Sequence, residues 1–149
     1  MSFSLRALAA LLIATLAAGP VHAQEAGLQS DRDKISYMVG MDVSKSVAPA
    51  LPDMDMPAFE RAIANGLAGG KPLIDDAASK QVGQALMTSI DARRNGKPLP
   101  VVDRQKVGLL IGGDIGRSLS QISAEIDLPV LLRGLKDAST PGGKTLLTP

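Results

Sequence analysis

A repeat within the chain constrains its fold more than any other feature of the sequence. Shifting the sequence by 72 positions brings residues 34–65 onto residues 106–137 without a gap. Two unrelated amphipathic helices would share apolar spacing, but not polar identities and a proline in fixed register. The sequence therefore predicts one structural unit present twice. The identical pairs are Lys34/Lys106, Gly40/Gly112, Asp42/Asp114, Ser46/Ser118, Asp55/Asp127, Pro57/Pro129 and Arg61/Arg133.

Each copy is predicted to consist of helices joined by turns. In the first copy, Asp33 is expected to cap a helix, because apolar residues follow it at helical spacing. Pro57 marks the start of a second helix, and a third is expected to begin near Asp75. The second copy repeats the first two helices and lacks the third, although Thr148-Pro149 would suit its start. Only two aromatic residues follow residue 23, which also favours helix packing over a β-sandwich.

The beginning of the chain has the layout of a secretory signal peptide. Arg6 precedes an apolar run over residues 7–18, and Val21-His22-Ala23 forms a small-residue cleavage site. The alternative, an uncleaved anchor, is disfavoured because the run is too short to cross a bilayer of about 30 Å as a helix. We therefore expect a periplasmic or secreted protein with no membrane span after signal removal.

These features predict five parts. They are the signal peptide (1–23), an N-terminal extension (24–32), a first helical repeat (33–96), a linker (97–102) and a second helical repeat lacking its third helix (103–149).

Composition excludes several classes of function. Once Arg6 is removed, fifteen of the sixteen basic residues remain against fifteen acidic ones, so no nucleic-acid partner is expected. The chain has no Cys or Trp, and its single His, His22, leaves with the signal peptide. Ser/His/Asp and Cys/His catalysis and Cys/His zinc sites are thereby excluded. We predict no catalytic residue, no cofactor and no metal.

Three motifs with possible chemistry are better explained as structure. Residues 108–114 have the glycine content of a nucleotide loop, but they lie within a helical pattern with no preceding strand. Residues 142–145 imitate the end of a phosphate-binding loop, yet the position for its first glycine holds Ala138, so a turn is expected. The acidic pairs Asp53/Asp55 and Asp75/Asp76 stand at helix starts, where carboxylates normally cap free amides.

Glycines and methionines indicate where helices are expected to pair. Gly40 and Gly112 occupy the same place in both copies, and a glycine inside a helix costs about 1 kcal/mol relative to Ala. Close approach of another helix would explain them, and Gly108, Gly113 and Gly116 form a looser set. Methionine suits adaptable apolar contacts, although ordinary core filling explains any single one equally well. The predicted helix-pairing or client interface comprises Met38, Val39, Gly40, Met41, Val43, Phe59, Ile63, Leu110, Ile111, Gly112, Ile115, Leu131 and Leu135.

Residues 33–46, followed by residues 55–59, resemble the opening of the N-terminal domain of FKBP-type prolyl isomerases of the macrophage infectivity potentiator kind. The resemblance recurs over residues 109–118 and 127–138, so the two matches cover most of the chain after residue 23. It implies an exported all-α module whose first two helices intertwine with those of a second subunit. In that family a long third helix carries the isomerase domain, and the cradle so formed holds folding clients.

This chain is expected to depart from the family pattern in three ways: the module is doubled, its third helix is short for a stalk, and no catalytic domain is expected within residues 1–149. Two aromatic residues cannot line the family's prolyl pocket, so the enzymatic activity is not expected here. Doubling suggests that the two copies pair within one chain as an intramolecular pseudo-dimer.

Three functions remain open from the sequence. The favoured one is a non-catalytic module of protein folding that binds unfolded or partly folded polypeptides, or a full-length FKBP-type isomerase, with a homodimer possible. The second is the front fragment of a prolyl isomerase whose catalytic domain lies beyond Pro149. The third is a structural adaptor of the cell envelope.

Overall fold

The computed structural model describes residues 27–148, which form helices and contain no strand. The all-α class predicted from the sequence is therefore confirmed for this part of the chain. The predicted signal peptide, residues 1–23, lies outside it. The elements are α1 (Asp31–Val47), η1 (Leu51–Asp53), α2 (Met56–Leu67), α3 (Asp76–Arg94), α4 (Arg104–Leu119), η2 (Ser120–Glu125) and α5 (Leu128–Ser139), where η denotes a 3-10 helix.

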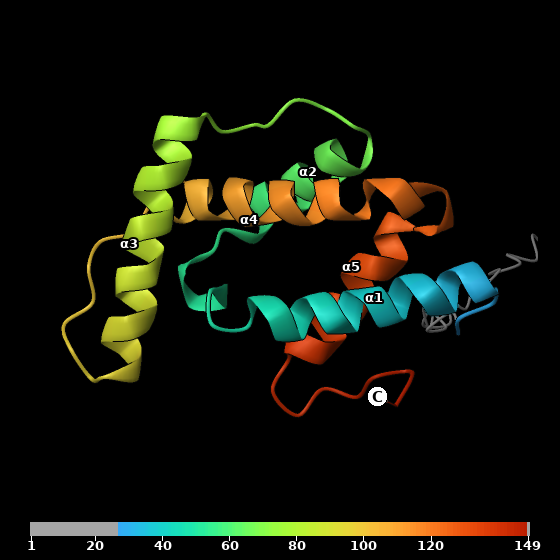
Figure 1. The fold of residues 1–149 in the computed structure, drawn as a ribbon. Coiled ribbons are helices and arrows are strands. Elements are labelled where there is room, and N and C mark those ends of the chain that lie inside the picture. The colour runs from blue at the N-terminus through green and yellow to red at the C-terminus, as the bar shows by residue number, and fades with distance from the viewer. Residues whose placement is uncertain (1–26, 149) are drawn as a thin grey trace, which may run out of the picture.

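Each of the first two helices has its main partner in the later half of the chain. The two most extensive helix contacts join α1 to α5 and α2 to α4. In Figure 1, α1 and α4 cross the molecule in front, with α5 behind α1 and α2 behind α4. The segment of residues 33–96 therefore packs on the segment of residues 103–149, and it does not form a separate bundle. We call these the first and second segments.

Small residues allow the paired helices to approach closely. A Cβ built on Gly40 would lie 2.8 Å from the backbone nitrogen of Leu135, so α5 passes where a side chain would otherwise be. A Cβ on Gly112 would likewise lie 3.1 Å from the carbonyl carbon of Phe59 in α2. The close approach predicted for these two glycines is confirmed. The prediction is wrong for Gly113, which faces open space.

The core follows the two helix pairs. Both aromatic residues that the structure describes are fully buried, Tyr37 at the α1–α5 contact and Phe59 at the α2–α4 contact. Aliphatic side chains from both segments fill the remaining volume. Every buried side-chain nitrogen and oxygen in the described part has a hydrogen-bond partner. The fully buried side chains of largest volume are Tyr37, Phe59, Met54, Ile63, Leu131, Leu135 and Val107.

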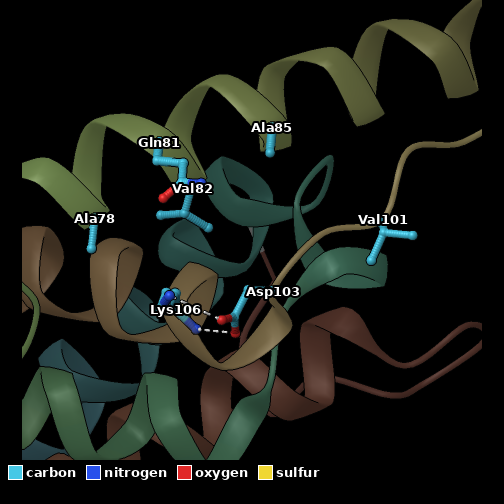
Figure 2. A pocket seen from close by; sticks show the side chains of 7 residues that line it. All are labelled: Ala78, Gln81, Val82, Ala85, Val101, Asp103 and Lys106. Atoms are coloured by element: carbon cyan, nitrogen blue, oxygen red, sulfur yellow. Dashed lines mark hydrogen bonds and ion pairs between the residues drawn. The ribbon is translucent and has the colours of Figure 1, made fainter.

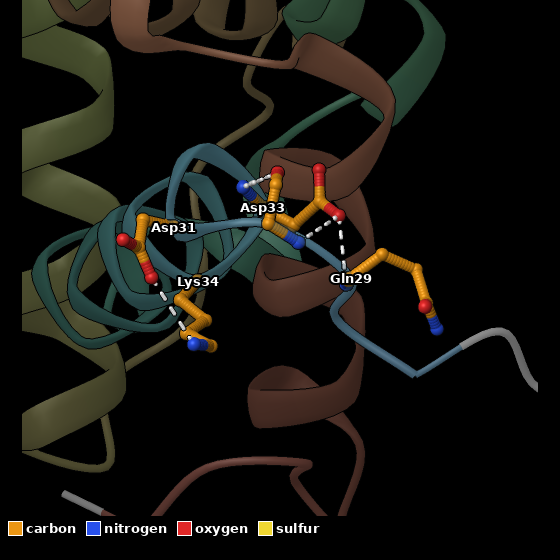
Figure 3. A network of polar contacts seen from close by, with 5 residues as sticks. Gln29, Asp31, Asp33 and Lys34 are labelled. Carbon is orange, nitrogen blue, oxygen red and sulfur yellow. Dashed lines mark hydrogen bonds and ion pairs between the residues drawn. The ribbon is translucent and has the colours of Figure 1, made fainter.

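Side-chain caps fix the helix starts. The α1 helix begins earlier than the sequence predicted, because Ser30 is its N-cap and Asp33 is the third helical residue. The two form a capping box: the Asp33 amide donates to Ser30 Oγ at 3.0 Å, while Asp33 Oδ2 accepts from the amides of Gln29 and Ser30 at 2.9 and 3.0 Å. Figure 3 shows this network beside the ion pair of Lys34 with Asp31.

The third helix lies across the end of the α2–α4 pair. As predicted, it begins after Asp75, whose carboxylate accepts from the Ala78 amide at 2.7 Å, and it ends before Asn95. Arg93 in its last turn donates to Asp53 of η1 at 2.9 Å. After α5 the described chain forms a turn at Gly142 and no third helix. No helix of the described part is both long and apolar enough to cross a bilayer.

Candidate binding groove

A groove of about 360 Å³ runs between α1 and α4, the two helices at the front of Figure 1. Its lining surface is mostly apolar, and it opens widely to solvent. Its lining comes equally from the two helices: Val39, Asp42, Val43 and Ser46 from α1, and Asp114, Ile115, Ser118 and Leu119 from α4.

The two walls of the groove carry the same chemistry at positions 72 apart. Asp42 faces the groove from α1 as Asp114 does from α4, and Val43 has Ile115 as its counterpart. The shared positions continue with a serine on each wall. The groove is therefore close to two-fold symmetric in composition, although both of its walls belong to one chain.

The floor is apolar and the rim is charged. Val43 and Ile115 are half-buried and pack against the central core, so the floor is continuous with that core. On the rim, Asp42 pairs with Lys45 at 3.3 Å, and Asp114 pairs with Arg117. Exposed pairs of this kind stabilise a helix by only a few tenths of a kcal/mol. They leave donors and acceptors accessible beside an apolar surface.

Most of the predicted interface residues fall into two groups. One group is buried between paired helices: Leu131 and Leu135 against α1, and Phe59 and Ile63 against α4. A second group, Val39, Val43 and Ile115, lines the groove. Gly40 and Gly112 belong with the buried set, Met41 is buried, and Ile111 is partly buried in α4.

Two predicted residues lie in neither group. Leu110 faces α3, since a Cβ on Gly83 would lie 3.8 Å from its side chain. Met38 is more than half exposed on α1. The structure thus does not gather all the predicted residues into one surface, and their role in binding a partner stays a prediction.

Sequence reasoning missed the polar half of the groove. Asp42, Ser46, Asp114 and Ser118 were noted as repeat identities and were not assigned to a surface. Their spacing contained the signal, because position 42 lies three residues after position 39 and position 46 three after 43, on one helical face. The identical polar pairs Asp42/Asp114 and Ser46/Ser118 therefore pointed to the groove, which the apolar spacing did not.

Tyr37 is a fully buried residue whose hydroxyl forms hydrogen bonds between the two segments. Its hydroxyl donates to Asp137 Oδ2 at 2.8 Å and accepts from the Leu146 amide at 3.0 Å. Burial raises the pKa of this hydroxyl above the ordinary tyrosine value. Tyr37 thereby connects α1 both to α5 and to Leu146, which follows α5. The raised pKa favours the neutral form of the hydroxyl.

Two helix-start carboxylates have lowered pKa values. Backbone amides of Gln29 and Ser30 donate to Asp33 and lower its pKa, and the Lys106 amide does the same for Asp103. Neither carboxylate belongs to the groove. Among the described residues, no group of three or more His, Cys, Asp or Glu side chains is arranged to hold a metal ion.

Comparison with protein families found a match over the first three α-helices. The family described as the domain amino terminal to FKBP-type peptidyl-prolyl isomerase matches residues 32–98, which span α1, α2 and α3. Comparison with curated proteins and with solved structures found no match. The matched segment coincides with α1, α2 and α3, so residues 32–98 are similar to the domain amino terminal to FKBP-type peptidyl-prolyl isomerase.

Proposed function

We propose that this chain is an exported, non-catalytic helical module related to FKBP-type prolyl isomerases. In this proposal it acts in protein folding by binding unfolded or partly folded polypeptides in the α1–α4 groove. The observation that carries the proposal is the groove itself, with an apolar floor, charged rims and the same residue types on both walls. Such a surface suits short apolar stretches of many sequences, because it offers contact area without a shaped pocket.

Intramolecular pairing takes the place of a dimer in this proposal. Related domains are expected to pair their first two helices with those of a second subunit, and here α4 and α5 occupy the partner's place. Gly40 against Leu131 and Gly112 against Phe59 support this interpretation, because each pair maps onto the other under the 72-residue shift. We therefore interpret the second segment as a copy of the first. Sedimentation should show a monomer at all concentrations, and an obligate dimer would contradict the pairing.

The groove can be closed without disturbing the core. Ser46 and Ser118 are exposed at its edge, and each hydroxyl donates only to a carbonyl of its own helix, at 3.1 and 2.9 Å. Arginine at both positions would lay two long side chains over the floor. Thr88 on α3 provides a matched control, since it is exposed, donates to the Gln84 carbonyl at 2.9 Å and lies outside the groove.

The test measures how well the purified chain prevents aggregation of a chemically unfolded client after dilution. Wild type and T88R should suppress aggregation equally, and S46R/S118R should lose most of the effect while keeping its helical circular dichroism. Equal suppression by the double variant would refute the groove as the binding surface. A prolyl isomerisation assay runs in parallel, and turnover at an enzymatic rate would overturn the non-catalytic assignment.

A further inference from the structure

The third helix is held in a defined site, which we call the α3 seat. The seat comprises Val107 and Leu110 of α4 together with Ala50 and Asp53 at η1. Val82 and Leu86 of α3 join Val107 and Ala50 in one buried cluster. Figure 2 shows the α4 end of this contact, where Val82 stands above the Lys106–Asp103 pair. At the other end Arg93 donates to Asp53.

The corresponding surface lies on α1 and η2, and no helix within residues 27–148 covers it. The residues 72 positions from the seat are Ile35 and Met38 of α1 and Ile122 and Glu125 of η2; we call them the open surface. Val107 is 0 % exposed, whereas its counterpart Ile35 is 38 % exposed. Ala50 is 6 % exposed and its counterpart Ile122 is 39 % exposed. Met38, the counterpart of Leu110, is 54 % exposed.

The surroundings of the two surfaces correspond as well. Lys106 pairs with Asp103 at 3.4 Å beside the seat, and Lys34 pairs with Asp31 at 3.1 Å beside the open surface. Figures 2 and 3 show these two pairs, each on the first turn of its helix. The first turns of α1 and α4 therefore carry the same ion pair beside the two surfaces, whereas η2 (Ser120–Glu125) is longer than η1 (Leu51–Asp53).

The start of a helix on the open surface is marked by Thr148. A hollow beside the start of α3 is lined by Asp114 and Arg117 of α4 together with Asp76. The corresponding hollow on α1 is lined by Asp42 and Lys45, and it is Thr148 that borders it. A helix placed on the open surface as α3 is placed on the seat would begin beside Thr148 and end beside η2.

An acidic residue, Glu125, lies at the η2 end of the open surface. Asp53 is only 9 % exposed, and its carboxylate accepts a hydrogen bond from the Arg93 guanidinium at 2.9 Å. Its counterpart Glu125 is exposed, and within residues 27–148 its carboxylate takes part in no ion pair. A basic side chain arriving at this point would find an unpaired carboxylate beside exposed Ile122.

We propose that the open surface binds an amphipathic helix of a partner polypeptide. The partner carries two apolar residues four positions apart, as Val82 and Leu86 are, and an arginine or lysine seven positions after the second, as Arg93 is. The apolar pair covers Ile35, Met38 and Ile122, and the basic residue pairs with Glu125. This inference rests on the correspondence between the two segments and not on the groove.

A synthetic peptide of residues 75–96 serves as the probe, because it has the required pattern. It is added to the full chain labelled at its methionine methyl groups. The Met38 resonance should shift in a saturable manner, while those of buried Met54 and of Met87, which is 66 % exposed on α3, stay in place. A peptide with Arg93→Ala should bind about tenfold more weakly, as expected for loss of a charge-assisted hydrogen bond.

Matched variants identify the surface. M38E should abolish binding and M87E should not, since both place a carboxylate at an exposed helical methionine. E125R should weaken the wild-type peptide and restore the affinity of a peptide carrying Arg93→Glu. Binding that M38E leaves intact would overturn the proposal, because the peptide would then have displaced α3 from its own seat.

Two further results separate the possible occupants. Self-association that M38E prevents would assign the open surface to a second copy of the chain and overturn the partner-helix proposal. The groove variant S46R/S118R should bind the peptide normally. Absence of aggregation suppression with normal peptide binding would therefore contradict only the groove proposal. Absence of peptide binding with normal aggregation suppression would contradict only the open-surface proposal.

Discussion

Two neighbouring glycines of α4 should respond in opposite ways to alanine. Gly112 and Gly113 have the same helical backbone, so both gain about 1 kcal/mol in helix propensity when a methyl group is added. The difference lies in what the methyl group meets. At Gly113 nothing lies within 4 Å of the added Cβ, whereas at Gly112 it overlaps the carbonyl oxygen of Phe59 and lies 3.0 Å from Ala62 Cβ.

The clash at Gly112 cannot be relieved by a rotamer change, because the atoms in the way belong to the backbone of α2. The α2–α4 pair must separate instead, and overpacking of this kind costs about 3 kcal/mol at the upper end of its usual range. After the gain in propensity, Gly112→Ala should lower the free energy of unfolding by about 2 kcal/mol. Gly113→Ala should raise it by about 1 kcal/mol.

The assay is urea denaturation of both variants and wild type, followed by far-ultraviolet circular dichroism. The midpoint order should be G113A, wild type, G112A, with the two variants separated by about 3 kcal/mol. Refutation would come from a G112A variant as stable as G113A, since the helices would then not be in contact at position 112. Gly40→Ala should repeat the loss at the α1–α5 contact.

Three further predictions test other contacts. Ser44 Oγ and Ser139 Oγ lie 2.8 Å apart in a chain without cysteine, so S44C/S139C should oxidise to a cross-linked monomer on a non-reducing gel; a cross-linked dimer would contradict intrachain pairing. Tyr37→Phe should lower the free energy of unfolding, measured by urea denaturation, by about 1–3 kcal/mol, because the hydrogen bonds of the Tyr37 hydroxyl between the two segments are lost. An unchanged midpoint would exclude a structural role for these hydrogen bonds. The lowered pKa values of Asp33 and Asp103 mean that their contribution is complete above the unfolded-state pKa of about 3.9 and is lost as pH falls through the folded-state values. D103N keeps an N-cap without titrating, so its unfolding free energy should fall less steeply with acidification than that of wild type.

Local chemistry made the helices predictable. A proline or a capping aspartate marked the starts of α2, α3 and α5, and the start of α1 is an instructive exception. The α1 helix begins at Asp31 because Ser30 caps it, and Asp33 closes the same capping box from inside the helix. Two suitable caps three residues apart compete, and the sequence alone does not rank them.

The partner of each helix was only partly predictable. Glycine at positions 40 and 112 predicted close approach, which the structure confirms, but a glycine says nothing about which helix approaches. Gly113 shows that a glycine in a helix does not always mark a helix contact, because Gly112 faces α2 whereas the adjacent Gly113 faces solvent. The groove was not predictable from apolar spacing, since its rim consists of exposed polar residues. The open surface was not predictable either, because it is recognised from the exposed fractions of corresponding residues, which only the folded structure gives.

The pairing of α1 with α5 sets the order in which the chain can fold. Tyr37 and Asp137 are joined across 100 positions, so α1 has no lasting partner until α5 has been synthesised. Contacts of such long sequence separation slow folding and keep early segments open, because loop closure precedes any gain in stability. We therefore expect α1 to stay unfolded until α5 has been made.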